Sequence, residues 1–341
     1  MGFAAAGRPR RRPRALRAAP RREGRLAAAR GRSEAGPTGM TAPAGKRLRR
    51  EIRVRALLFG WPLLRLMPLW FGAALGWLAW YLVPRQRRLA REHLSIAFPE
   101  KDEAERDRIG RRSFANLGRA AVETAQAHRL DIRTTMELAP AGEALLREAH
   151  AEGKGVVVAT AHIGAWELFA RRVAALGIPC GTVAKEAHDP RLTALLERSR
   201  KQGGVRVFWR GAPLSAREIL RFLRDEGGIF GILIDQDTRV AGHFVPFFGR
   251  PAFTPRAAGD LAAHLGAPLL FACAHRLASG VHRIVVRRIE APRTGDRDRD
   301  SFALTAAATK AIEDEVRKRP DEWVWMHPRW RTQQLDISEE K

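Results

Sequence analysis

His162 and Glu167 are the residues of this 341-residue sequence whose types and spacing best suit catalysis. The apolar run 155–160 (GVVVAT) predicts a strand, and His162 follows its carboxyl end, where ligand sites of open α/β sheets gather. We expect Gly164 to allow a bend that folds Glu167 back to the imidazole. The carboxylate would fix the tautomer and leave the other ring nitrogen as a general base. On spacing alone, a structural histidine is the commoner explanation.

A second candidate cluster, Asp235-Gln236-Asp237, ends the apolar run GIFGILI. Two carboxylates in a D-x-D pattern can hold a divalent metal beside a nucleotide-sugar, as in glycosyltransferases. No glycine-rich nucleotide loop accompanies them in the sequence, so we favour orientation of a substrate or capping of a turn. Lys185 and Arg200 are candidate anion contacts, with ordinary surface charge as the alternative.

Alternating strands and helices must position these residues. From residue 140 the pattern predicts an α/β fold with a mainly parallel sheet flanked by helices. The expected strands are 155–160, 180–184, 205–208, 228–234, 268–274 and 282–287, and the expected helices are 165–176, 189–202, 213–226, 256–266 and 302–318. We assign 140–332 to this core, 85–139 to a helical segment and 333–341 to a tail.

The longest apolar stretch, 57–84, predicts a membrane anchor within residues 46–84. Its part 66–84 carries no charge and is about as long as a minimal transmembrane helix, roughly 20 residues. Four tryptophans and the single tyrosine lie in the stretch, as in an interfacial aromatic belt. Basic residues flank both ends, so a full crossing and a tilted, half-inserted helix are both open. A buried core helix is the third possibility.

The formal net charge of +24 is concentrated at the N-terminus, where residues 1–55 hold 17 basic and 3 acidic side chains. Such an excess suits nucleic acid, an anionic membrane, or acidic substrates and carrier proteins. We expect residues 1–45 to be a disordered basic tail, or an extension upstream of a start at Met40. The cysteines, Cys180 and Cys273, form no CxxC pair, which disfavours a structural zinc or a disulfide and favours a reducing compartment.

Several ordered motifs resemble one enzyme family. His162-x4-Glu167 resembles the H-x4-[D/E] signature of the lysophospholipid acyltransferase superfamily, and most of all its late lipid A (lauroyl/myristoyl) acyltransferases. The other matches, in order, are His93-Leu94-x3-Phe98-Pro99-Glu100, Arg200 with Gly203-Gly204, Asp235-Gln236-Asp237, Phe244–Gly249 and the Trp323–Trp330 segment. His93 and Ala165 depart from the family, where asparagine is usual. The resemblance spans roughly residues 50–332.

The resemblance implies a glycerolphosphate-acyltransferase-like fold behind an N-terminal membrane helix. It also implies transfer of a fatty acyl chain from acyl carrier protein to a hydroxyl of a phosphorylated glycolipid, a lipid A precursor. The site would face the cytoplasm at the bacterial inner membrane, with no cofactor, no metal and no serine or cysteine nucleophile. The expected catalytic residues are His162 and Glu167, and the expected substrate-binding residues are Lys185, Arg200, Asp235, Asp237 and Arg329.

Three features of the candidate site stay open at this point. Backbone N–H groups after Gly164, or Arg200, are candidate donors to the oxyanion. Phe244–Gly249 suits either the core or a wall of an acyl channel, whereas the tryptophans of 323–330 suit packing. For His327 and Arg329, contact with a phosphate is a further option.

Two other functions compete with this one. The first is an acyl-CoA-dependent transferase acting on a phosphoinositide mannoside or a lysophospholipid. The second is a basic, membrane-tethered nucleic-acid-binding protein, which would need a functional tail and a structural His162. The acyltransferase reading has acyl carrier protein, a glycolipid and membrane lipids as partners, and no nucleic acid.

Overall fold

A computed structural model describes residues 44–187, 189–211 and 215–333. The chain divides into two compact units, residues 1–51 and 52–341. Within the first unit the described residues, 44–51, belong to helix α1 (Ala44–Leu64). The tail predicted for residues 1–45 therefore lies outside the described residues, apart from the first two positions of α1, and the tail predicted for 333–341 lies outside them beyond its first residue.

The apolar stretch 57–84 contains the end of one helix, the whole of a second and the first residue of a third. Helix α1 ends at Leu64, a turn follows, and α2 (Leu69–Leu82) starts after Pro68, which has an extended backbone conformation. Pro84 then opens α3 (Pro84–Ala97). No helix in the described ranges combines the length and apolarity that a membrane crossing requires. The predicted run 66–84 is thus reduced to the 14-residue helix α2, which lies between the turn at Pro68 and the start of α3 at Pro84.

Glycines bring α2 against α4 (Glu103–Gln126). A Cβ atom added to Gly72 would lie 2.4 Å from the carbonyl oxygen of Gly118, and one added to Gly118 would lie 1.9 Å from that of Gly72. The two backbones therefore touch, and larger residues at either position would force them apart. The opposite side of α2 is exposed and strongly apolar, with Trp70 68% and Leu82 67% accessible.

The core of the fold is a seven-stranded sheet with the order β1-β9-β8-β2-β5-β3-β4. Every neighbouring pair is parallel except β8 and β9, so the predicted mainly parallel α/β sheet is confirmed. The strands are β1 (Met136–Leu138), β2 (Val156–Thr160), β3 (Cys180–Ala184), β4 (Val205–Trp209), β5 (Ile229–Leu233), β8 (Leu269–Arg276) and β9 (His282–Ile289).

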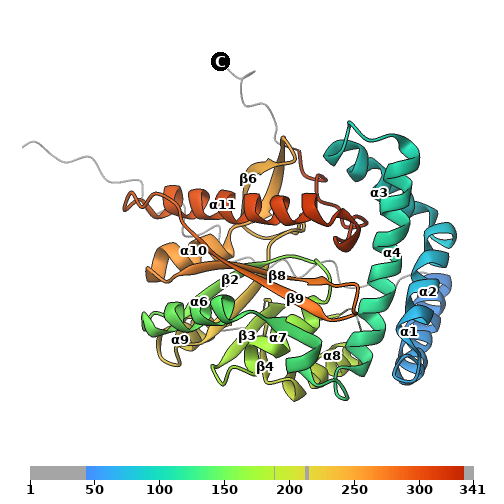
Figure 1. Cartoon of the computed structure of the whole chain (residues 1–341), viewed down its shortest axis with the longest axis horizontal. Helices are drawn as coiled ribbons and strands as arrows, with labels where there is room; N and C mark the ends of the chain where they lie inside the picture. Colours follow the sequence, from blue (N-terminus) through green and yellow to red (C-terminus); the bar gives the residue numbers. More distant parts are fainter. Residues whose placement is uncertain (1–43, 188, 212–214, 334–341) are drawn as a thin grey trace, which may run out of the picture. The chain divides into compact units, whose positions relative to one another are not determined.

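Helices cover both faces of the sheet, with α10 and α11 on one side and α6 and α7 on the other (Figure 1). The alternation of β2 explains this, because Val157 and Ala159 enter one core and Val156 and Val158 the other. The remaining helices are α5 (Ile132–Thr135), α6 (Pro140–Ala151), α7 (Trp166–Ala174), α8 (Pro190–Gln202), α9 (Ser215–Arg224), α10 (Ala257–Leu265), α11 (Arg297–Lys318) and η1 (Pro320–Glu322).

The segment Phe244–Gly249 belongs to a separate hairpin of β6 (Gly242–Phe247) and β7 (Arg250–Pro255). Phe248 and Gly249 have φ angles of 52° and 73° and make the tight turn that joins its strands. Val245 and Phe247 are fully buried. The sequence left open whether this segment belongs to the core or to the wall of an acyl channel, and Val245 and Phe247 belong to the core.

Candidate active site

His162 lies in the loop 161–165 between β2 and α7, at the carboxyl edge of the sheet. Gly164 makes the predicted sharp bend with a φ of 56°, and an added Cβ would lie 2.1 Å from the carbonyl oxygen of Ala274. The loop pairs with the segment 322–324. Ile163 forms a bridge with Trp323, and the Gly164 N–H donates to the carbonyl of Glu322 over 3.0 Å.

The imidazole of His162 is held by Asp235, which follows the neighbouring strand β5. One carboxylate oxygen lies 2.8 Å from Nδ1, and the other accepts the His162 backbone N–H and the Trp323 indole N–H, each over 2.8 Å. Asp235 is only 1% exposed. Burial disfavours its charge, but the electrostatic attraction of His162 and these hydrogen bonds hold the pKa of Asp235 well below its usual range.

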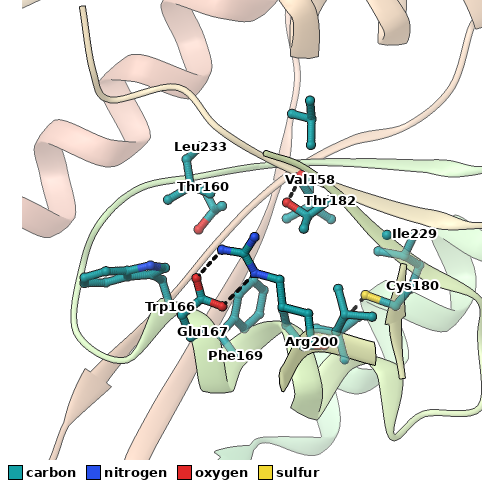
Figure 2. Close-up of a pocket in the computed structure, with 16 residues that line it drawn as sticks. Val158, Thr160, Trp166, Glu167, Phe169, Cys180, Thr182, Arg200, Ile229 and Leu233 are labelled. Carbon is teal, nitrogen blue, oxygen red and sulfur yellow. Dashed lines mark hydrogen bonds and ion pairs between the residues drawn. The ribbon is translucent and has the colours of Figure 1, made fainter. Parts of the chain in front are cut away.

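Glu167 has a different partner from the one predicted. Its carboxylate forms a two-pronged ion pair with Arg200 of α8, with distances of 3.0 Å to Nε and 2.5 Å to the terminal nitrogen (Figure 2). Burial opposes the charge of Arg200, but the hydrogen bond to Glu167 raises its pKa. The predicted contact of Glu167 with His162 is therefore corrected. Glu167 lies in the first turn of α7 and reaches α8, while Asp235 already occupies the imidazole Nδ1.

Gln236 and His327 complete the surroundings of the imidazole. The Gln236 amide nitrogen lies 3.1 Å from Nε2 and 3.2 Å from Nδ1 of His162, so the side chain packs against the ring. The His327 ring centroid is 4.8 Å from that of His162. Burial, together with the electrostatic effect of the neighbouring His162 ring, lowers the pKa of His327 to about 4. A neutral His327 therefore accompanies His162 near neutral pH.

Three predicted substrate-binding residues have internal partners instead. Asp235 holds the imidazole, and Asp237 (3% exposed) accepts hydrogen bonds from Arg331 and Thr332. Arg329 (1% exposed) donates to the carbonyl of Phe253 and to the Thr254 hydroxyl, beneath the hairpin. These side chains are already enclosed by protein, which also removes the geometric basis for a D-x-D metal site.

A cleft of about 420 Å³ opens beside His162 at the ends of β3, β4 and β5. Lys185, Arg200, Arg210 and Gln236 are among its lining residues. Lys185 and Arg210 are exposed, and neither has an ion-pair partner within the described ranges. The structure thus brings Lys185 and Arg200 to the site as predicted. Arg210 was missed, because a single arginine after a strand carries no signal in the sequence.

A small apolar pocket of about 60 Å³ lies behind the cleft, between the sheet and α7 (Figure 2). Val158, Phe169, Cys180, Ile229 and Leu233 are among the side chains that line it. Gly231 of β5 also borders it, and an added Cβ there would meet only the carbonyl oxygen of Gly181, at 3.8 Å. The side chains of the Glu167–Arg200 ion pair line both hollows and stand at their boundary.

The site thus combines an imidazole backed by a buried carboxylate, at the strand ends of a parallel α/β sheet, with a cleft and an apolar recess. The chain belongs to the bacterial lipid A biosynthesis acyltransferase family, whose model matches residues 46–332. It is therefore an acyltransferase of lipid A biosynthesis, and a glycolipid acceptor follows from the family.

Curated relatives agree with this assignment. The chain is 27% identical to a lipid A biosynthesis palmitoleoyltransferase of Escherichia coli K12 over 272 residues, which cover 78% of this chain and 86% of the relative. It is 27% identical to a lipid A biosynthesis acyltransferase of Haemophilus influenzae over 267 residues (76% and 83%). A lipid A biosynthesis lauroyltransferase of E. coli K12 is 23% identical over 276 residues (76% and 84%).

Proposed function

We propose that this protein transfers a fatty acyl chain from the thioester of acyl carrier protein to a hydroxyl of a phosphorylated lipid A precursor, with His162 as the general base. The observation that supports this most is the Asp235 contact to Nδ1, 2.8 Å long, at a histidine that lines the cleft. A carboxylate on Nδ1 fixes the tautomer in which Nε2 carries the lone pair.

In the proposed step, Nε2 of His162 takes the proton of the acceptor hydroxyl as its oxygen attacks the thioester carbon. The C–O bond forms, and the C–S bond breaks when the tetrahedral intermediate collapses. The leaving thiolate takes the proton back from the imidazolium, so no covalent acyl-enzyme is needed. Asp235 stabilises the imidazolium while it exists, which is the role first predicted for Glu167.

Backbone N–H groups at the start of α7 are the proposed donors to the oxyanion. The helix begins at Trp166, directly after the catalytic loop, and its N-cap residue, Ala165, makes no side-chain capping bond. Free N–H groups and the helix dipole at this end favour developing negative charge. Arg200 serves less well as an oxyanion donor, because Glu167 already occupies its guanidinium.

The two hollows suit the two ends of the substrates. The apolar pocket behind the Glu167–Arg200 ion pair fits the end of an acyl chain, whose remaining length would lie in the cleft. Lys185 and Arg210, which have no ion-pair partner among the described residues, suit the phosphate of the glycolipid acceptor.

The exposed apolar side of α2 is the proposed contact with the inner membrane, at its cytoplasmic face. Trp70, Trp77 and Tyr81 lie among its exposed side chains, and such aromatic residues are typical of the lipid–water interface. Because α2 has 14 residues, about 21 Å at 1.5 Å per residue, the arrangement favours a helix lying in the interface over one that crosses it.

The test is His162→Ala, assayed in detergent micelles by mass spectrometry of the acylated lipid A precursor, with acyl carrier protein and coenzyme A thioesters as alternative donors. We expect kcat to fall about 10²- to 10⁴-fold, the usual worth of a general base. His264→Ala, at an exposed histidine of α10, is the matched control and should retain full activity. Normal transfer by a folded His162→Ala protein would refute the mechanism, and preference for acyl-CoA would replace the proposed donor.

A further inference from the structure

A second histidine lies buried behind the catalytic loop 161–165, away from the cleft. His275, near the end of β8, has a side chain only 8% exposed, between two glutamates. Its Nε2 lies 2.9 Å from a carboxylate oxygen of Glu315 in α11, and its Nδ1 lies 3.3 Å from one of Glu322 in η1. The two glutamates are seven positions apart, so one imidazole joins the end of α11 and the following turn to the sheet.

The ring carries a positive charge in this setting. Burial opposes that charge, but hydrogen bonds with Cys273 and Glu322 raise the pKa of His275 to about 9. Both ring nitrogens can then donate, one to each glutamate. The other charged groups that face this pair are Arg287 and Lys318, on Glu315, and Arg319, on Glu322.

Glu322 connects this buried pair to the catalytic loop. Its carboxylate accepts the backbone N–H of Arg276 over 3.0 Å, which fixes the residue against the end of β8. Its backbone carbonyl accepts the N–H of Gly164. The next residue, Trp323, bridges Ile163 and donates its indole N–H to Asp235. A continuous line of contacts therefore runs from His275 through Glu322, Trp323 and Asp235 to His162.

Two further contacts hold the same segment from the side of α4. The Ser113 hydroxyl donates to the carbonyl of Trp323 over 2.5 Å, and the Asn116 amide donates to that of Asp321 over 2.7 Å. These contacts fix the backbone of the segment on the side of α4, and its pairing with Ile163 and Gly164 fixes it on the side of the loop. The Glu322 carboxylate is the side chain that ties the segment to β8, beside the loop.

We propose that His275 and Glu322 are positioning residues for catalysis, because their buried ion pair sets segment 322–324 and thereby the Asp235 carboxylate behind His162. The inference rests on the proposed role of His162. In this proposal His275 and Glu322 affect catalysis without contacting the substrate.

A bound metal ion is the rival explanation of the same cluster. Ligand atoms of Cys273, His275 and Glu315 all lie within 4.8 Å of one another, and a cysteine, a histidine and a glutamate are suitable ligands for zinc. However, Arg287 and Lys318 already pair with Glu315. The existing contacts therefore satisfy the cluster without an ion.

The experiment compares Glu322→Gln and His275→Gln with a matched control in the full-length protein. His282→Gln is that control, because His282 is also buried and its Nε2 lies 2.9 Å from Glu123, but it makes no contact with segment 322–324. We expect kcat of the two test variants to fall about 10- to 100-fold, as small displacements of catalytic groups do, with both KM values nearly unchanged. The apparent pKa on the acidic side of their kcat–pH profiles should also differ from that of the wild type. The control should have a lower melting temperature but the kcat and the kcat–pH profile of the wild type.

Four results would overturn the inference or the function on which it rests. Unchanged kcat and pH profile in folded Glu322→Gln, while His162→Ala is inactive, would refute the positioning role and leave the proposed function standing. An active His162→Ala protein would instead refute the proposed function. A stoichiometric metal in the purified wild-type protein, measured by elemental mass spectrometry and lost in His275→Gln, would replace the ion pair with a metal site. If the charge variants do not fold, Trp323→Phe tests the same path, and wild-type kcat there would refute it.

Discussion

Asp235→Asn should disable the enzyme by changing the tautomer of His162, while leaving the fold intact. Three N–H groups converge on the two Asp235 oxygens: His162 Nδ1 on one, and the His162 backbone and the Trp323 indole on the other. If the amide NH₂ replaced the oxygen that accepts from the His162 backbone and the Trp323 indole, it would face two donors. If it replaced the oxygen beside Nδ1, it would face only one. The orientation with the NH₂ beside Nδ1 is therefore preferred. It requires Nδ1 to accept a hydrogen bond, which moves the ring proton to Nε2 and removes the base.

The size of this effect follows from what is lost. A general base contributes about 10²–10⁴-fold, and removing the equivalent carboxylate from a serine-protease triad lowers kcat about 10⁴-fold. We therefore expect kcat to fall about 10³- to 10⁴-fold, with little change in KM. Exchanging a buried charged acceptor for a neutral one should also lower the free energy of unfolding by about 1.5–3 kcal/mol.

The decisive comparison is Asp235→Asn against Glu167→Gln in the same micellar assay. Glu167→Gln keeps the side-chain shape and can still accept from Arg200, so its kcat should fall less than about 10-fold, as for one weakened partly exposed ion pair. The double variant His162→Ala, Asp235→Asn should be no worse than His162→Ala alone, because the two residues share one function. A larger loss from Glu167→Gln than from Asp235→Asn would refute our assignment of the orienting carboxylate.

Four further predictions concern the rest of the molecule. Gly231→Leu should shorten the acyl chain transferred, read as product mass, whereas Gly231→Ala should change it little; an unchanged chain would remove the pocket from the mechanism. Lys185→Ala and Arg210→Ala should each raise KM for the phosphorylated acceptor about 10-fold, the worth of one charge-assisted hydrogen bond, and equal effects on an unphosphorylated acceptor would contradict a phosphate contact. The pKa of His275 is raised from 6.5 to about 9, so its contribution to the free energy of unfolding is complete below pH 6.5 and is lost as the pH rises through about 9. Denaturant titrations across this range should show the free energy of unfolding falling by about 3 kcal/mol in the wild type but not in His275→Gln. Trp70→Glu should move protein from the membrane fraction to the supernatant, and an unchanged distribution would point to another anchor.

The sheet was predictable because its central strands are short runs of apolar residues between turn signals. The predicted 180–184 matches β3 in full, and 155–160 and 228–234 match β2 and β5 to within one residue at each end. The strand β1 was missed because three residues are too few to show a period. The hairpin was missed because Pro246 and Pro251 lower the strand propensity of its two sides. The turn at Pro68 was missed because hydropathy does not distinguish one apolar helix from two.

In the candidate site too, local features were predictable from the sequence and long-range contacts were not. The position of His162 follows from local pattern: a strand, a glycine bend and a helix. Its partner does not, because Asp235 is 73 positions away and approaches only because β2 pairs with β5. Strand order is a property of the packed sheet, and it also brings Arg200 to Glu167 across helices. Nearness in sequence therefore favoured the wrong carboxylate, although the D-Q-D motif contained the right one.

The glycine contact between α2 and α4 has a mechanical consequence. The same helix α4 that touches α2 through Gly118 also holds segment 321–323 through Ser113 and Asn116, so it acts as a strut between the proposed lipid-facing surface and the frame of the active site. The touching backbones hold α2 and α4 close together. If α2 lies in the membrane interface as proposed, α4 keeps the cleft at a set distance from the lipid surface. Finding the acceptor then becomes a two-dimensional search, and only the acyl donor has to arrive from solution.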